Sequence, residues 1–178
     1  MKHGTLPLET ERLILRRISL LDSEEMFDNW ASNDEVTQFL TWPTHQNIDI
    51  TKMVISSWVD SYKDTTFYQW GIELKDTHEL IGTISSVDVN LDKNEVEVGY
   101  VIGQDYWNKG YTTEALKRVI SYFFEEEKFD KILVGHDKDN YASKCVIKKC
   151  GFEYVGTKET PNNTNPHGIS LYYELLNK

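Results

Sequence analysis

Cysteine is nearly absent from this sequence, and long apolar runs are missing altogether. The two cysteines, Cys145 and Cys150, lie five positions apart beside a Lys-Lys pair, a spacing that fits neither a disulfide framework nor a metal site. Reduced thiols are the default state of such residues in a cytoplasmic protein. The N-terminus has no apolar leader region, and no stretch approaches the length of a membrane span. We therefore expect a soluble, unprocessed, cytoplasmic protein without a metal.

Basic residues are in the minority. The chain has 19 Lys and Arg against 29 Asp and Glu, which gives a formal net charge of −10. A surface this acidic repels phosphate backbones and anionic lipid head groups, which argues against nucleic acid and membranes as partners. The charge favours cationic small molecules or basic peptides, although its simplest role is to keep the protein soluble.

Internal repeats, low-complexity tracts and linkers rich in Gly, Ser or Pro are also missing. The 178 residues, of which 39% are hydrophobic and 12% aromatic, suffice for one globular core and are short for two. We expect a single domain over residues 1–178.

The first part of the chain predicts one strand and two helices. Residues 13–15 with Ile18 form an apolar run typical of a strand. Asp22 followed by Glu25 is a capping-box pattern, which predicts a helix through Met26, Phe27 and Trp30. A second helix is predicted over residues 48–62 by apolar residues at helical spacing, namely Met53, Val54, Trp58, Val59 and Tyr62.

The rest of the chain mixes strands and helices. A three-strand meander is predicted over residues 67–74, 80–89 and 95–102, the last half-exposed because apolar and polar residues alternate along it. An amphipathic helix follows, with apolar positions from Ala115 to Phe124. After a short strand at 131–135, Asn140 caps a helix that runs to Cys150, and Gly151 supplies its left-handed end. Closing strands at 152–155 and 170–175 complete an α+β fold.

The most informative segment joins the strand at 95–102 to the amphipathic helix. A loop that leads into a helix exposes backbone N–H groups without an intrahelical partner, and these donors, with the helix dipole, suit phosphate oxygens. Gly110 fits because a bound phosphate approaches the backbone too closely for a Cβ atom, and Lys109 adds a cation. On these grounds alone, a purely structural turn is the alternative.

The residues of this loop resemble those of a known family. The run Tyr106-Trp107-Asn108-Lys109-Gly110-Tyr111-Thr112-Thr113-Glu114-Ala115 is similar to the pyrophosphate loop of GNAT acetyltransferases, in the version typical of the branch that acetylates ribosomal-protein N-termini. Three further pieces resemble that branch in the same order, at residues 10–16, at residues 97–100, and at residues 140–143 followed by 149–152. Together the matches span nearly the whole chain.

The resemblance implies a fold and an activity. The fold is α+β, a single GNAT domain with a central mixed, mostly antiparallel sheet of about seven strands, about four flanking helices, and a V-shaped opening between the fourth and fifth strands. The activity is transfer of an acetyl group from acetyl-CoA to a primary amine by direct attack in a ternary complex. The residues implied in binding coenzyme A are Tyr100, Val101, Ile102, Trp107, Asn108, Lys109, Gly110, Tyr111, Thr112, Thr113, Asn140 and Ser143.

Three positions depart from the general family pattern. Trp107 stands where Gln or Arg usually begins the loop, as it often does in this branch, and Thr112 replaces a Gly or Ala. Thr112 is bulkier, but its hydroxyl can cap a helix or donate to a phosphate. Ile147 occupies the position at which many members keep a tyrosine general acid, so that role must lie elsewhere.

The resemblance also implies roles in the reaction. The backbone N–H near Val101 would polarise the thioester carbonyl. Ser143 would give a proton or a hydrogen bond to the leaving thiolate, and Asn140 would orient the pantetheine arm or cap the helix. The acceptor must lose a proton before it attacks, and Glu97 is the first candidate base, directly or through a water. The alternative interpretations are structural. Asn140 and Ser143 would form an ordinary capped helix turn, and Glu97 would be a solvated carboxylate on a half-exposed strand.

The remaining site candidates are histidines, one acid and aromatic residues. The second candidate base is His136, although a lone histidine is more often structural. Further base candidates are His45, His78 and Glu159, whereas His3 and His167 lie in terminal or loop segments. Three aromatic residues are candidates for the walls of an acceptor pocket, namely Trp42, Trp58 and Tyr68. The alternative is that they belong to the hydrophobic core.

Two other functions are compatible with the sequence. One is a non-catalytic acyl-CoA-binding or sensor domain of the same fold, and the other is a protein-interaction module that uses aromatic and acidic surface. Within the enzyme interpretation the acceptor stays open among a peptide N-terminus, an aminoglycoside, a polyamine and a free amino acid, and the charge favours a cationic one. A homodimer is also compatible with the sequence.

Overall fold

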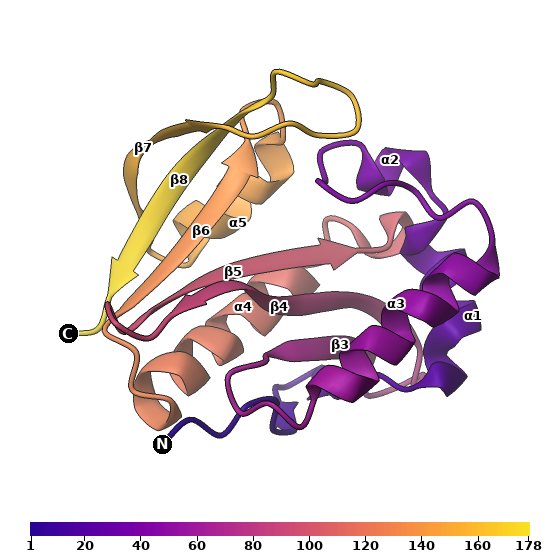
Figure 1. Ribbon diagram of the computed structural model, residues 1–178, viewed down its shortest axis with the longest axis horizontal. Helices are drawn as coiled ribbons and strands as arrows, with labels where there is room; N and C mark the ends of the chain where they lie inside the picture. The colour runs from indigo at the N-terminus through magenta and orange to yellow at the C-terminus, as the bar shows by residue number, and fades with distance from the viewer.

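A computed structural model describes residues 1–178 and shows one eight-stranded sheet flanked by helices (Figure 1). This confirms the expected α+β class. The elements, in chain order, are β1 (Leu8–Glu9), β2 (Leu13–Arg16), η1 (Leu20–Asp22), α1 (Ser23–Met26), η2 (Phe27–Ala31), α2 (Asp34–Thr37), α3 (Ile48–Ser61), β3 (Gln69–Leu74), β4 (Leu80–Asn90), β5 (Glu95–Ile102), η3 (Gln104–Tyr106), α4 (Tyr111–Ser121), η4 (Tyr122–Glu126), β6 (Lys131–Asp137), α5 (Tyr141–Lys149), β7 (Glu153–Glu159) and β8 (Ile169–Leu176).

The strands lie in the order β1-β2-β3-β4-β5-β6-β8-β7, and β5 with β6 is the parallel pair among otherwise antiparallel neighbours. That pair is in register only between residues 95–98 and residues 131–134. Beyond this point β5 stays paired with β4, whereas β6 continues along β8. The two strands therefore diverge, which confirms the V-shaped opening between them (Figure 1).

Helices cover the two faces of the sheet unequally. In Figure 1, α3 lies in front of β3 and β4, while α4 and α5 lie behind the sheet; we call these the front face and the back face. The back face buries a cluster of 23 apolar residues and the front face a cluster of 7. Since successive strand residues alternate between faces, Val96 and Val98 of β5 join the back cluster and Val101 packs against the front one.

The helices on the back face confirm the sequence pattern. In α4, Ala115, Leu116 and Val119 are fully buried on the sheet, and the helix is strongly amphipathic. At the start of α5, Asn140 Oδ1 accepts a hydrogen bond from the Ser143 backbone N at 3.1 Å, as expected of a cap residue. After α5 the chain turns through a left-handed glycine, as expected.

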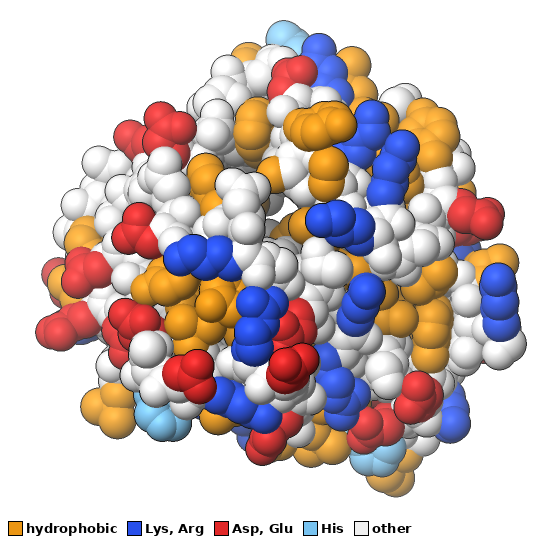
Figure 2. Space-filling view, turned by 180° about the vertical axis from the view of Figure 1, so that it is seen from behind, with side chains coloured by type: hydrophobic (Ala, Val, Ile, Leu, Met, Phe, Trp, Pro, Cys, Tyr) orange, Lys and Arg blue, Asp and Glu red, His pale blue; other side chains and the backbone are white.

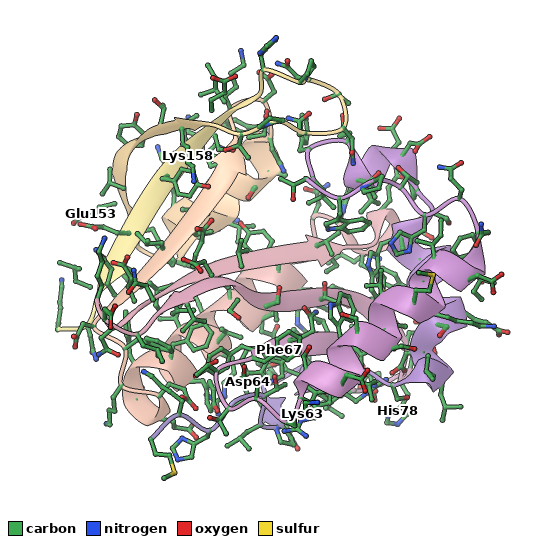
Figure 3. All side chains as sticks on the ribbon, viewed as in Figure 1. Lys63, Asp64, Phe67, His78, Glu153 and Lys158 are labelled. Carbon is green, nitrogen blue, oxygen red and sulfur yellow. The ribbon has the colours of Figure 1, made fainter.

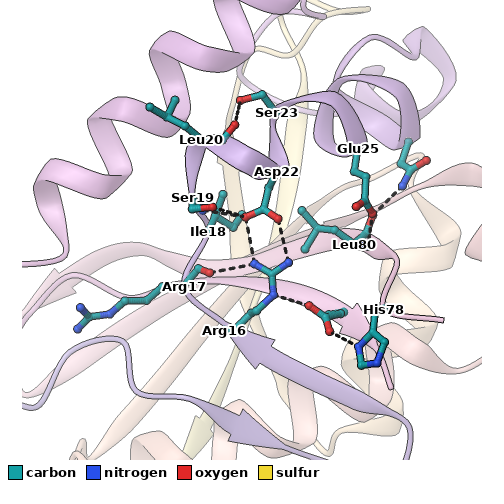
Figure 4. A network of polar contacts seen from close by, with 12 residues as sticks. Arg16, Arg17, Ile18, Ser19, Leu20, Asp22, Ser23, Glu25, His78 and Leu80 are labelled. Carbon is teal, nitrogen blue, oxygen red and sulfur yellow. Dashed lines mark hydrogen bonds and ion pairs between the residues drawn. The ribbon is translucent and has the colours of Figure 1, made fainter. Parts of the chain in front are cut away.

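The capping box predicted at Asp22 and Glu25 is wrong. Asp22 caps the turn before it, where its Oδ2 accepts from the Ser19 backbone N at 2.7 Å. Both oxygens of the same carboxylate accept from the Arg16 guanidinium at 2.9 and 3.0 Å, and Arg16 also binds Glu73 on β3 (Figure 4). Both oxygens of the carboxylate are thus engaged by Arg16 and the Ser19 backbone N, and these charge-assisted bonds decide its direction. The α-helical part of α1 is accordingly short, and a π-helical turn continues it.

Smaller differences from the expected elements have local causes. Helix α3 is confirmed, but it buries Thr51 and Ile55, whereas Met53 is 73% exposed. Strand β5 is less exposed than its alternation predicts, because Lys131 on β6 binds Glu95 at 2.8 Å and covers it. Strand β1 and helix α2 are too short to show a periodic pattern in the sequence. No helix has the length and apolar character that crossing a bilayer requires.

Candidate active site

The loop between β5 and α4 presents a row of free backbone donors. The amides of residues 108–113 donate no hydrogen bond within the protein. The next amide, that of Glu114, donates to the Gly110 carbonyl at 3.0 Å and begins the helical ladder. Six unpartnered donors at the positive end of the α4 dipole make this position suited to an anion.

The backbone conformation of the loop depends on glycine. Asn108 has a φ of +59° and Gly110 a φ of +80°. Left-handed residues within a turn are typical of the backbone concavities that bind anions. A Cβ atom at Gly110 would lie 3.4 Å from the Arg12 guanidinium, which is an ordinary contact, so it is the left-handed backbone conformation that favours glycine there.

An ion pair ties the start of α4 to β2. The Glu114 carboxylate accepts from the Arg12 side chain at 2.7 Å, from the Arg12 backbone N at 2.8 Å and from the Thr10 hydroxyl at 2.5 Å. Arg12 in turn donates to the Lys109 carbonyl at 3.0 Å and lies over the Tyr111 ring. Burial raises the pKa of Glu114, but these donors more than offset it and hold the pKa below its ordinary value. The segment of residues 10–16 and the loop, both of which resemble the family, are thus bonded to each other, and these bonds hold the loop in place.

A basin of about 330 Å³ lies beside these free amides. On the back face, Lys and Arg side chains surround a hollow (Figure 2). The residues that line the basin are Glu11, Gly110, Thr113, Glu114, Lys117 and Lys149. The sequence did not single out Lys117 and Lys149, because neither lies in the loop motif.

Two loop side chains turn toward the protein. Lys109 Nζ donates to the Asp105 carbonyl at 2.8 Å and lies 5.7 Å from the Tyr106 ring centroid, so its charge points back along the loop. The Trp107 indole N–H donates to the Ile102 carbonyl at 2.9 Å. The lysines that line the basin beside the free amides are Lys117 and Lys149 instead. Thr112 and Thr113 lie half-buried in the first turn of α4.

The register of β5 decides which of its peptide groups face the opening. The Gly103 backbone N donates to the Ile81 carbonyl of β4 at 2.8 Å. Since alternate residues of a strand point to the same edge, the N–H of Val101 also faces β4, where it pairs with Thr83. The oxyanion role expected for Val101 is thus not available to its amide. The peptide groups of Tyr100 and Ile102 face the open edge instead.

A pair of hydroxyls lies across the opening on the back face. Ser143 Oγ on α5 is 2.7 Å from the Tyr100 hydroxyl on β5. Asn140 holds the Ser143 backbone from the other side through the helix cap. Burial strongly raises the pKa of Tyr100, so its hydroxyl keeps its proton. The sequence did not predict this pairing, because no local pattern joins a strand residue to a helix 43 positions later.

Glu97 lies on the opposite side of β5 from Tyr100. The strand pleat directs Glu97 to the front face, where α3 does not cover the sheet (Figure 1). Burial raises the pKa of the Glu97 carboxyl, and the nearby Asp88 raises it further. Lys158 and the Tyr172 hydroxyl lower this pKa, but the net value lies above the ordinary one. Glu97 is half-buried, so the interpretation as a freely solvated charge does not hold. A half-buried carboxylate with a raised pKa, on a face that no helix covers, is suited to accept a proton.

The other base candidates are occupied elsewhere. His136 is buried, with Nδ1 2.6 Å from the Asp137 carbonyl and Nε2 3.3 Å from the Tyr173 hydroxyl. The remaining candidate side chains are paired with other groups, namely His3 with Glu127, His45 with Thr51, His78 with Glu73, and His167 with Glu159. No group of three His, Cys, Asp or Glu residues has the arrangement of a metal site.

Two of the three candidate aromatic walls lie on the front face of the sheet. Trp42 and Trp58 pack against the front cluster together with Val101, on the same face as Glu97. Tyr68 is fully buried in the back cluster, and its hydroxyl donates to Glu127 at 2.8 Å. The core role is therefore the correct one for Tyr68.

A bridge crosses the divergent end of the sheet. The loop of residues 160–168 meets the segment of residues 37–42, and Figure 1 shows this loop next to α2. Asn163 Nδ2 donates to the carbonyls of Thr37 and Trp42 at 2.9 and 2.7 Å, and its backbone N donates to Leu40 at 3.2 Å. The bridge joins the two halves of the molecule beside Trp42.

Comparison with known proteins agrees with this arrangement. The family model for the acetyltransferase (GNAT) domain matches residues 12–153. YoaA of Bacillus subtilis (strain 168), an uncharacterized N-acetyltransferase, is 34% identical over 169 residues, which is 91% of this chain and 95% of YoaA. The ribosomal-protein-S5-alanine acetyltransferase structure from Vibrio fischeri has a TM-score of 0.85 at 18% identity and covers 97% of both chains. The structure of RimL, a ribosomal L7/L12 α-N-protein acetyltransferase in complex with coenzyme A, has a TM-score of 0.85 at 15% identity and covers 96% of this chain and 98% of RimL.

The divergent sheet with a free helix start beside it defines the fold class as that of the GNAT proteins. The chain belongs to the GNAT acetyltransferase family. Membership confirms the resemblance seen in the loop and in the three ordered segments around it.

Proposed function

We propose that this protein transfers an acetyl group from acetyl-CoA to a primary amine, by direct attack while both substrates are bound. The observation that carries the proposal is the row of six free amides at residues 108–113, beside the open edge of β5. Those donors suit the diphosphate of coenzyme A, and a family relative, RimL, has been solved with coenzyme A.

The donor side is built by the back face and the loop. Lys117 and Lys149 add positive charge beside the free amides and favour the phosphate groups. The backbone N–H groups of Tyr100 and Ile102 and the Tyr100 carbonyl face the edge that β6 leaves, while the Ile102 carbonyl accepts from the Trp107 indole. An extended pantetheine arm pairs with the free groups like an added strand. The Tyr100 amide, rather than that of Val101, then stabilises negative charge on the thioester oxygen.

The proton transfers take place on opposite faces of β5. Glu97 accepts a proton from the acceptor ammonium on the front face, which leaves a neutral nucleophile. Ser143 gives a hydrogen bond or a proton to the leaving thiolate on the back face, and the Tyr100 hydroxyl, 2.7 Å away, supports it. This division keeps the proton acceptor and the proton donor from neutralising each other.

The acceptor is a primary amine on a peptide N-terminus or a small molecule. Glu97 and Asp88 interact on the front face, and the chain carries a net charge of −10, both of which favour a cationic acceptor. Trp42 and Trp58 provide aromatic surface on the same face. The solved relatives that act on ribosomal proteins support a peptide N-terminus as the first acceptor to test.

The donor assignment is tested by calorimetry of coenzyme A binding. Gly110→Glu places a negative charge among the free amides, and we expect affinity to fall about tenfold or more. Gly151→Ala is the matched control, because Gly151 also has a positive φ, +86°, and its Cβ would meet nothing within 4 Å. Undiminished affinity of Gly110→Glu would remove the loop assignment.

The chemical roles are tested by single-turnover kinetics with an accepted amine. Glu97→Gln and Ser143→Ala should each lower the rate by about a hundredfold or more, since a positioned base or acid contributes that much. Glu174→Gln, a half-buried carboxylate paired with β6 and β7, is the control and should stay near the wild-type rate. Rates within about threefold for both test variants would discard both roles.

A further inference from the structure

One tyrosine of the front face has no role in the scheme above. Tyr172 of β8 lies opposite Gly135 of β6. A Cβ atom built on Gly135 would come 2.9 Å from Tyr172 Cζ and 3.0 Å from its Cε1. The hydroxyl-bearing end of the ring therefore lies directly over Gly135, in space that any other residue at that position would fill.

This position brings the Tyr172 hydroxyl across β6 to Glu97. Glu97 lies opposite Leu133, two residues before Gly135 on β6, so Glu97, Gly135 and Tyr172 share the front face just where β5 and β6 separate. The Tyr172 ring therefore extends from β8 across Gly135 toward β5, on the face that carries the Glu97 side chain. Lys158 on β7, labelled in Figure 3, extends over β8 and places its Nζ 5.9 Å from the Tyr172 ring centroid.

We infer that Tyr172 is a positioning residue for the catalytic base: its hydroxyl donates to the Glu97 carboxylate, directs it to the opening and keeps it ionised. The inference rests on the proposed role of Glu97. In the reaction, the acceptor ammonium gives its proton to the free oxygen of Glu97, and Tyr172 keeps its own proton throughout. Glu97 then releases the proton to solvent. Tyr172 does not touch the acetyl group or the leaving thiolate.

The electrostatics around Glu97 agree with this role. Burial and the neighbouring Glu97 raise the pKa of Tyr172 by more than the Thr160 hydroxyl lowers it, so the Tyr172 hydroxyl keeps its proton. For Glu97, burial raises the pKa, and the main groups that oppose burial are Lys158 from β7 and Tyr172 from β8. Asp88 from β4 acts in the direction of burial.

The other charged groups nearby are paired with one another or lie farther along the strands. On β5 itself, Glu95 is bound to Lys131 of β6 at 2.8 Å. Strand β6 places the uncharged Leu133 opposite Glu97, and Glu174 of β8 lies on the far side of Leu133. Tyr172 is thus the uncharged donor that reaches the carboxylate from β8.

The test is the pH dependence of kcat/KM for Tyr172→Phe and for Gly135→Ala. Loss of the hydroxyl donor raises the pKa of Glu97 further, so the acid limb, where activity falls as Glu97 becomes protonated, should move to higher pH by about half a unit or more. In Gly135→Ala the new Cβ displaces the Tyr172 ring, and the limb should move in the same direction. Tyr173→Phe removes a hydroxyl one position away on the back face and should leave the limb in place.

A second measurement separates this inference from the proposed function. Titration of the Glu97 carboxyl by NMR in the Tyr172→Phe protein reports its pKa without any turnover, and we expect an upward shift of the same size. If Glu97→Gln is inactive while both the limb and the carboxyl pKa are unchanged in Tyr172→Phe, the inference is wrong and the base assignment stands. If the carboxyl pKa rises in Tyr172→Phe while Glu97→Gln keeps full activity, the contact is confirmed and the catalytic role of both residues is wrong.

Discussion

Strands β3 and β7 show how differently the two halves of the sheet are built. All six residues of β3 are buried, whereas six of the seven residues of β7 are exposed and the seventh is half-buried. β3 lies between α3 on the front face and α4 on the back face, while β6, β8 and β7 have an uncovered front face (Figure 1). The half that contains β3 supplies burial, and the other half leaves surface free for a ligand.

The two halves are joined where the site lies. The parallel register of β5 with β6 is short. Near its end the covered half carries Glu97 and, beyond it, Tyr100, while the open half carries Ser143 and Tyr172. Each group therefore needs a partner from the other half. We expect substitutions deep in the covered half to change stability and substitutions near the seam to change activity, and three predictions test that division.

The largest effect is expected for Trp70→Ala in β3. Trp70 is fully buried, and its indole N–H donates to the Leu6 carbonyl at 2.6 Å. Loss of a buried tryptophan leaves a large cavity, so the free energy of unfolding should fall by about 3–5 kcal/mol. Tyr154→Ala in β7, where the side chain is 55% exposed, should change it by about 0.5 kcal/mol. Equal losses in urea denaturation of the two variants would contradict the division.

An intermediate effect is expected for Arg16→Met, and it should depend on pH. Burial raises the pKa of Asp22 and of Glu73, but the hydrogen bonds from Arg16 and other donors more than offset it, so both lie below their ordinary values of 3.8 and 4.5. A carboxyl with a lowered folded pKa stabilises the fold above its unfolded pKa, and this contribution is lost as pH falls through the folded value.

The Arg16→Met protein should therefore lose about 2 kcal/mol of unfolding free energy at neutral pH, and the loss should shrink below about pH 4.5. Urea denaturation at several pH values measures the difference from wild type. Arg118→Met is the control, because its partner Glu126 is an exposed carboxylate at 3.5 Å. A loss that is the same at every pH would show that the Arg16 network does not act through its charges.

The smallest effect on stability is expected for Asn163→Ala at the bridge between the halves. Its side chain is exposed and makes two hydrogen bonds, to Thr37 at the end of α2 and to Trp42 beyond it, so the free energy of unfolding should fall by about 1 kcal/mol or less. The KM for the amine should rise a few fold while coenzyme A binding is unchanged, since the bridge lies beside Trp42 on the acceptor side. Asn177→Ala removes a comparable bond at 3.1 Å to Phe129 and should leave both constants unchanged.

The parts of the fold that the sequence predicted are those with a strong local pattern. The apolar stripe of α4, the Asn140 cap and the left-handed turn at Gly151 are all confirmed, since each depends on residues within a few positions of one another. The capping box at Asp22 failed because a distant partner, Arg16 on the sheet, competes for the same carboxylate.

The parts of the candidate site that the sequence missed depend on contacts between distant segments. The direction of the Val101 amide follows from strand register, and the pairing of Tyr100 with Ser143 follows from how α5 meets β5. No signal in the sequence marks Tyr172 either. The position of its ring depends on the pairing of β8 with β6, which sets Tyr172 opposite Gly135.

The sequence by itself determined the helix start with its free amides, because backbone donors at a helix end are unpaired wherever the helix lies. It also determined family membership, through motifs that run along the chain. Only the tertiary structure decided which face each side chain uses and which peptide groups face the opening. The physical reason is that register, pleat and the divergence of two strands are set by pairing between segments far apart in the chain, and no short-range pattern encodes that pairing.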